Sequence, residues 1–92
     1  MPNAEYIDTT PLITEMMKRG FVTDYDPQQS VALVPRGIWV GSHPAIREGI
    51  SRLLAEHSAH ARDSKTEWLE VKDSDSGRRL ARYSQAQGFR QQ

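Results

Sequence analysis

The segment TEWLEVKDSDSGRRLARYS, residues 66–84, constrains the fold more than any other part of this chain. Apolar and polar residues alternate on both sides of Asp75-Ser76-Gly77, and this period of two predicts two β-strands joined by a tight turn. Three cross-strand pairs follow from that loop: Leu69 with Tyr83, Val71 with Ala81, and Glu70 with Arg82. The first two pairs form an apolar face and the third is a charge pair on the other face, so pattern and register agree.

Three short strands are predicted upstream, in the segments FVTDY (21–25), SVALV (30–34) and GIWVG (37–41). Proline and glycine in Pro35-Arg36-Gly37 favour a three-residue hairpin loop between the second and third strands. The segments then form an antiparallel meander in which Leu33 lies opposite Trp39. Because both faces of this meander are apolar, we expect both to be covered.

Two helices complete the predicted elements. The first spans about 11–19, begins at Pro11 and ends at Gly20, which is predicted as a left-handed C-cap. The second runs from about 42–44 to 60. Its predicted core stripe consists of Ile46, Ile50, Leu53, Leu54, His57 and Ala61. Gly49 interrupts this helix, and close packing against a strand is the reason we expect for it, with a kink as the alternative.

The order of these elements predicts an α+β fold: a short helix, a three-strand antiparallel meander, a helix and a C-terminal β-hairpin. It comprises about five strands, with two helices on one face. A chain of 92 residues is expected to form a single small domain with a modest core. The ends, 1–8 and 86–92, lack an apolar period and are predicted to be flexible.

Composition excludes several classes of function. Twelve basic and twelve acidic residues give a net charge of zero, so no global field attracts nucleic acid or an anionic membrane. The absence of cysteine excludes disulfides and thiolate chemistry, and it indicates a reducing, cytoplasmic environment. No stretch of 18 apolar residues occurs and the first ten residues do not resemble a signal peptide, so we expect a soluble protein with no membrane partner.

The sequence Gly41-Ser42-His43-Pro44 invites a catalytic interpretation, but the pattern around it does not support one. A nucleophile elbow needs a glycine two residues after the serine, where this chain has Pro44. We therefore predict that Ser42 or His43 caps the second helix, with binding of an anion at the helix start as an alternative. No catalytic residue and no cofactor are predicted.

Two histidines at the end of the second helix, His57 and His60, are three residues apart, a spacing that allows both to bind one metal ion. His57 lies on the predicted core stripe, and no histidine or acidic residue lies four positions beyond either of them. A half-buried histidine near the end of a helix is the favoured interpretation, and no metal ligand is predicted.

Four arginines, Arg78, Arg79, Arg82 and Arg90, lie between residues 78 and 92, a segment without an acidic residue. Such a segment can contact a phosphate backbone, so a nucleic-acid-binding regulator is the alternative function that the sequence allows. Because Arg82 faces Glu70 in the predicted register, a solvated edge strand protected by arginine is favoured over nucleic-acid binding.

Large apolar residues are also predicted on the sheet face that the helices leave open: Leu33, Trp39, Trp68 and Leu80, with Arg82 beside them. A surface of this kind is typical of protein interfaces. We therefore expect a non-catalytic protein-binding module that binds another protein or a second copy of itself. Its size and lack of catalytic motifs favour an accessory protein of a phage or plasmid, such as an anti-CRISPR-like inhibitor of a host defence complex or an adaptor.

Overall fold

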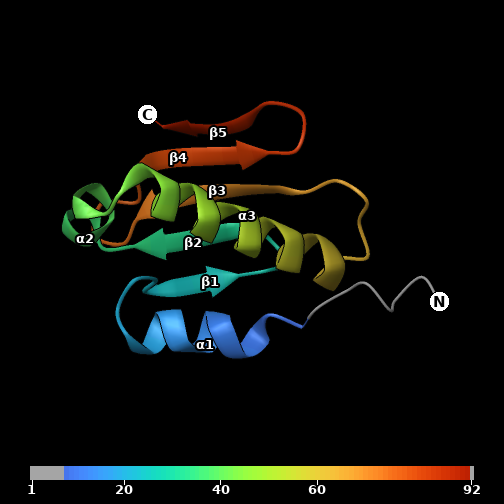
Figure 1. Cartoon of the computed structure of the whole chain (residues 1–92), viewed down its shortest axis with the longest axis horizontal. Coiled ribbons are helices and arrows are strands. Elements are labelled where there is room, and N and C mark those ends of the chain that lie inside the picture. The colour runs from blue at the N-terminus through green and yellow to red at the C-terminus, as the bar shows by residue number, and fades with distance from the viewer. Residues whose placement is uncertain (1–7, 92) are drawn as a thin grey trace.

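The computed structural model describes residues 8–91 and shows an α+β arrangement in which these residues form three helices and a five-stranded sheet (Figure 1). In chain order the elements are α1 (Thr10–Lys18), β1 (Asp24–Asp26), β2 (Val31–Val34), α2 (Arg36–Gly41), α3 (Pro44–Ala61), β3 (Trp68–Asp73), β4 (Arg79–Ser84) and β5 (Gly88–Gln91). The predicted fold class is confirmed. The segment predicted to be flexible at 1–8 lies outside the described residues, apart from Asp8.

Helix α1 ends at the glycine that the sequence predicts as its C-cap. Gly20 has a φ of +83°, a left-handed conformation that costs glycine little because it has no Cβ. The amide of Phe21 donates to the carbonyl oxygen of Met16 at 3.0 Å, and the amide of Gly20 donates to that of Met17 at 3.1 Å. This pair of bonds is a Schellman motif, and it ends the helix before β1.

The strands lie across the sheet in chain order, β1-β2-β3-β4-β5. Neighbouring strands are antiparallel except β2 and β3, which are parallel. A parallel pair needs a crossover connection, and α2 and α3 provide it. The register predicted for the C-terminal hairpin is confirmed, with Leu69 opposite Tyr83, Glu70 opposite Arg82 and Val71 opposite Ala81.

The third strand of the predicted meander is wrong, because residues 37–41 belong to helix α2. Pro35 precedes this helix in an extended conformation, and its carbonyl oxygen accepts a hydrogen bond from the amide of Trp39 at 3.0 Å. The helical turn buries Trp39 and leaves Ile38 and Val40 exposed. As a strand, residues 37–41 would have placed apolar side chains on both faces of the sheet. As a helix, they need to bury only the side chain of Trp39.

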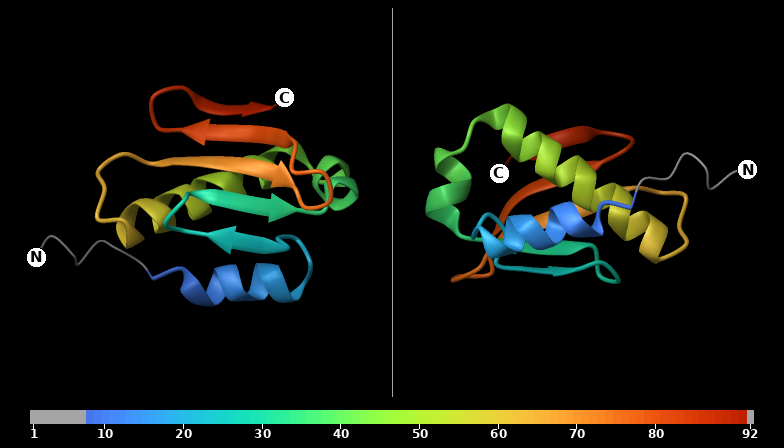
Figure 2. Two further views of the ribbon diagram at one scale, coloured as in Figure 1. Left: turned by 180° about the vertical axis from the view of Figure 1, so that it is seen from behind. Right: turned by 60° about the horizontal axis from the view of Figure 1, so that its bottom comes forward.

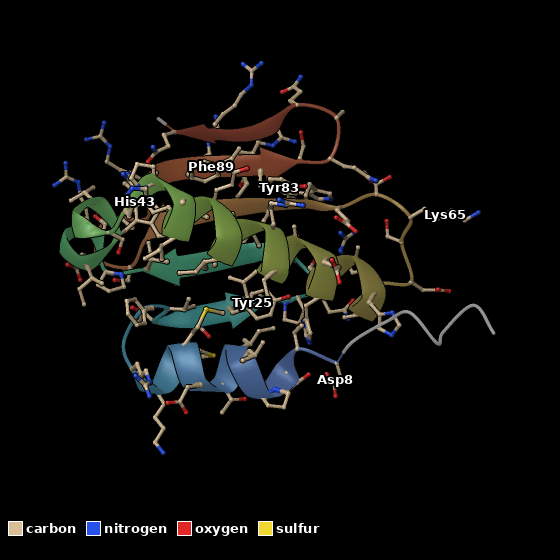
Figure 3. The ribbon with its side chains drawn as sticks, viewed as in Figure 1. Asp8, Tyr25, His43, Lys65, Tyr83 and Phe89 are labelled. Atoms are coloured by element: carbon tan, nitrogen blue, oxygen red, sulfur yellow. The ribbon has the colours of Figure 1, made fainter. Side chains whose placement is uncertain are left out.

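The fifth strand instead lies near the end of the chain, within the segment 86–92 that the sequence predicts as flexible. β5 is antiparallel to β4, with Phe89 opposite Tyr83 (Figure 3) and Arg90 opposite Arg82. Gly88 opens the strand at a φ of +75°. The side chain of Gln91 accepts a hydrogen bond from the guanidinium of Arg47 on α3, so the helix layer and the last strand are directly connected.

Helices α1 and α3 lie on the same side of the sheet (Figure 2). The core between α3 and the sheet includes Leu54, Ala55, Val34, Leu69 and Val71. The predicted core stripe of α3 is rotated, because the fully buried positions include the small residues Ser51 and Ser58 while the side chain of Ile46 is 52% exposed. The two serine hydroxyls donate to backbone carbonyl oxygens, so small polar residues can lie against the sheet without losing hydrogen bonds.

Candidate functional site

The side of the sheet opposite α1 and α3 is not covered by a helix of the described chain, as the view from behind shows (Figure 2). Strand alternation assigns these residues to the uncovered sheet face: Asp24 and Asp26 of β1, Val31 and Leu33 of β2, Trp68, Glu70 and Lys72 of β3, Arg82 of β4 and Arg90 of β5. Their partners in alternation, such as Leu69 and Val71, are buried beneath α3. We use the term uncovered sheet face for this set of residues.

Trp39 does not lie on this face, contrary to the sequence prediction. Its side chain is 3% exposed and belongs to the core, where its ring packs edge-on against Phe89 with centroids 6.4 Å apart. The cause is the helical conformation of residues 36–41, which turns the indole inward. Its indole Nε1 is buried without a hydrogen-bond partner among the described residues.

Two predicted interface residues, Leu33 and Trp68, do lie on the uncovered sheet face, and both are half-buried. The ring of Trp68 already has a neighbour, because the guanidinium of Arg62 lies 5.5 Å from its centroid in a cation–π contact. Val31, on β2, is the third apolar side chain of this face. The apolar part of the face is therefore small and lies among charged groups.

Leu80 lies beside an irregularity in the sheet. The register of β3 and β4 shifts between Val71 and Lys72, so a β-bulge interrupts the alternation beside Leu80. Leu80 is half-buried and packs against the core. It also lines a depression of about 240 Å³ together with Arg36, Asp73, Ser76, Arg78 and Arg79. The structure thus separates Arg78 from Arg82 and places it beside Arg36, a neighbour that the sequence does not suggest.

Charges on the uncovered sheet face are partly balanced at its centre. The carboxylate of Glu70 forms ion pairs with Arg79 at 3.1 Å and with Lys72 at 3.9 Å. Arg82 lies opposite Glu70 in the register, but these two side chains form no ion pair within the described residues. On its other side Arg82 lies opposite Arg90, and both arginines are exposed.

The β1 edge of this face, opposite β5, is acidic. Asp24 and Asp26 are exposed and alternate along β1, so both carboxylates lie on the same side as Val31 and Leu33. A depression of about 280 Å³ is lined by Asp24, Tyr25, Asp26, Gln29, Val31, Leu33 and Lys72. Asp26 also accepts hydrogen bonds from the amides of Gln28 and Gln29, which organise the turn into β2. The β1 edge therefore combines negative charge with a hollow.

The Ser42–His43 pair is a structural element of the helix start. His43 is the N-cap of α3 (Figure 3), and its Nδ1 accepts a hydrogen bond from the amide of Ala45 at 3.1 Å. The hydroxyl of Ser42 donates backward to the carbonyl oxygen of Ile38 at 2.7 Å. The imidazole and the hydroxyl are thus engaged with different backbone groups, and the cap alternative of the sequence prediction is confirmed for His43.

His57 connects three elements, α3, β1 and α1. Its Nδ1 lies 2.9 Å from the hydroxyl oxygen of Tyr25, and its Nε2 lies 3.3 Å from the Thr10 hydroxyl. The Tyr25 hydroxyl donates to the carbonyl oxygen of Leu54, so its oxygen accepts from Nδ1–H of a neutral imidazole. Burial lowers the pKa of His57, which favours this neutral form. Within residues 8–91 no group of three histidine or acidic residues is arranged to hold a metal ion.

Sequence reasoning misses the exposed apolar residues at the junction of α2 and α3. Ile38, Val40 and Ile46 are 47%, 50% and 52% exposed, although the first two are predicted in a strand and the third in a core stripe. A six-residue helix that buries one tryptophan leaves its other large side chains outside. Pro35, which can precede a helix as well as open a turn, is the only signal for this alternative.

Comparison with protein-family models, with curated proteins and with solved structures finds no match. Among the described residues, no helix has the length and apolar character needed to span a membrane.

Proposed function

We propose that this chain is a non-catalytic protein-binding module whose binding surface is the uncovered sheet face. The observation that carries the proposal is the cross-strand pair Arg82–Arg90, in which two exposed arginines lie directly opposite each other. Like charges at directly paired positions destabilise a sheet. An anionic side chain of a partner removes that repulsion, so the pair is more favourable in a complex than in the free chain.

The composition of the face supports a protein partner. Trp68 and two arginines are residue types that dominate binding energy in protein interfaces, and Val31 and Leu33 supply a small apolar centre. The hydroxyl of Ser42 and the imidazole of His43 are used by the helix start, which supports a non-catalytic role. The accessory-protein class, an inhibitor or adaptor acting in the cytoplasm, is the setting we propose for this binding.

The experiment exposes three immobilised baits to the same cell lysate. The baits are the wild-type chain, Arg82→Glu/Arg90→Glu, and the matched control Arg52→Glu/Lys65→Glu. Each double variant changes the net charge equally, but Arg52 lies on the exposed side of α3 and Lys65 in the loop before β3 (Figure 3). We expect a protein of defined mass to bind the wild type and the control after nuclease treatment and to be lost from Arg82→Glu/Arg90→Glu. Equal retention by all three baits contradicts the proposal, and so does a wild-type bait that binds neither another protein nor free chain of its own sequence.

A second candidate, nucleic-acid binding, is favoured by the depression in which Arg78 and Arg79 join Arg36. Guanidinium groups around a hollow suit phosphate oxygens. The test is fluorescence anisotropy with a labelled 20-nucleotide duplex and the matching single strand. If this candidate is correct, Arg78→Ala/Arg79→Ala weakens binding, and the affinity of the wild type falls about 40-fold between about 50 and 200 mM salt, as expected for three phosphate contacts. Absence of binding at low salt contradicts it.

A further inference from the structure

We infer that the occupant of the uncovered sheet face is a second copy of this chain, packed face to face about a two-fold axis that runs parallel to the strands. This inference rests on the proposed binding role of that face and names its partner. Its basis is the distribution of charge across the sheet.

Charge is segregated along the sequence and therefore across the sheet. Residues 1–30 contain five acidic and two basic residues, whereas residues 78–92 contain four arginines and no acidic residue. Because the strands lie side by side in chain order, the acidic β1 and the basic β4 and β5 occupy opposite edges. One row of cross-strand neighbours shows the gradient: Asp26, Val31, Glu70, Arg82 and Arg90.

Two arrangements bring such faces together with two-fold symmetry. An axis across the strands places each strand against its own copy, so that Asp26 meets Asp26 and Arg90 meets Arg90. An axis parallel to the strands reverses the order of strands, so that Asp26 meets Arg90 of the second copy. Both arrangements keep the strand directions aligned, as packed sheets require, and they differ mainly in the sign of the edge contacts. The charges therefore favour the axis parallel to the strands.

The groups between the edges are compatible with this arrangement. The hollow beside Asp24 and Asp26 offers room for an arginine side chain of the second copy, with Leu33 and Val31 against its aliphatic stem. Glu70 lies near the axis and faces its own copy, but Arg79 and Lys72 of the same chain balance its charge. The repulsive Arg82–Arg90 pair gains a carboxylate from the opposite β1.

The size of the face sets the expected affinity. Five strands spaced about 4.8 Å apart and up to six residues long give a flat area of at most about 500 Å². A standard protein interface buries about 800 Å² per partner, and smaller ones are weak or transient. We therefore expect a dimer that dissociates with dilution, with a dissociation constant on the order of micromolar.

The test uses sedimentation equilibrium of the purified chain over a range of concentrations, with two charge-reversed variants. Asp24→Lys/Asp26→Lys makes both edges basic, and Arg82→Glu/Arg90→Glu makes both edges acidic.

We expect the wild type and the control Arg52→Glu/Lys65→Glu to dimerise, and each charge-reversed variant to dimerise at least about tenfold more weakly. An equimolar mixture of the two variants should restore the dimer, because both edges of a mixed pair then carry opposite charges. Circular dichroism of each variant, together with Asp24→Lys alone, checks that folding is retained.

A wild-type chain that remains monomeric at millimolar concentration overturns the inference. So does a dimer that both charge-reversed variants retain, because another surface then forms it, or a mixture of folded variants that stays monomeric. A monomeric wild-type chain whose bait still captures a protein dependent on Arg82 and Arg90 identifies a different partner for the face. That result overturns the second copy as occupant while supporting the proposed binding function.

Discussion

At the scale of single residues, two glycines with opposite roles give a sharp test. Gly20 has a φ of +83°, whereas Gly49 lies inside α3 and a Cβ added there meets no atom within 4 Å. We predict that Gly20→Ala lowers the free energy of unfolding by about 1–2 kcal/mol because of strain in the left-handed region. We predict that Gly49→Ala raises it by about 0.5–1 kcal/mol through improved helix propensity.

Urea unfolding of both variants measures these changes, and because both remove a glycine from the unfolded chain, the difference between them isolates the folded state. A loss of stability in Gly49→Ala would contradict the open environment of that residue. The sequence-based expectation that Gly49 allows close packing against a strand is corrected by the structure, since the residue is exposed. A one-dimensional pattern shows that a glycine interrupts a helix but does not show which side of the helix it faces.

At the scale of elements, helix α2 has one large anchor. Trp39 is 3% exposed and packs in the core, whereas Trp68 is half-buried on the uncovered sheet face. We predict that Trp39→Ala lowers the free energy of unfolding by about 3–5 kcal/mol, as for other buried aromatic residues. Trp68→Ala should cost only about 1–2 kcal/mol, because it loses partial burial and the contact with Arg62.

Denaturant unfolding monitored by circular dichroism compares the two variants, and Trp39→Phe serves if the alanine variant is too unstable to purify. Similar costs at both tryptophans would contradict the assignment of residues 36–41 to a helix that buries its indole. The same experiment distinguishes the observed element from the strand that the sequence predicts, because a tryptophan on an uncovered sheet face would be as tolerant of truncation as Trp68.

The elements also show how far sequence reasoning extends. The sequence predicts the three cross-strand pairs of the β3–β4 hairpin from Leu69–Tyr83 to Val71–Ala81, because alternation sets their register locally, but it does not predict the shift between Val71 and Lys72. It does not predict the helix at 36–41, since apolar side chains on both sides of Trp39 fit a short buried strand and a short helix equally well. The parallel pairing of β2 with β3 is non-local, because it depends on how the helices between them cross the sheet.

In the candidate site, too, the sequence predicts what depends on local alternation and misses what depends on irregular or distant structure. The sequence places Leu33 and Trp68 on the correct face because each follows the alternation of a regular strand. It misplaces Trp39 because its element is misassigned, and it does not predict the β-bulge beside Leu80, which cannot be read from the pattern. Arg90 is a candidate in the sequence only for its charge, and its position opposite Arg82 requires the fifth strand.

At the scale of the whole molecule, a net charge of zero hides a charge gradient that concentration and salt should reveal together. If unfolding is coupled to dissociation of a dimer, a tenfold rise in protein concentration stabilises each protomer by about 0.7 kcal/mol and raises the Tm by about 3–4 °C. Raising the ionic strength from about 0.1 M to about 1 M shortens the screening length from about 10 Å to about 3 Å. We therefore predict that the Tm depends on concentration at low salt and loses most of that dependence at high salt, as measured by differential scanning calorimetry. The Tm of Arg82→Glu/Arg90→Glu at low salt should depend on concentration less than the Tm of the wild type does. Concentration dependence that persists at about 1 M salt would mean that the apolar centre formed by Val31, Leu33 and Trp68, rather than the charged edges, sets the strength of association.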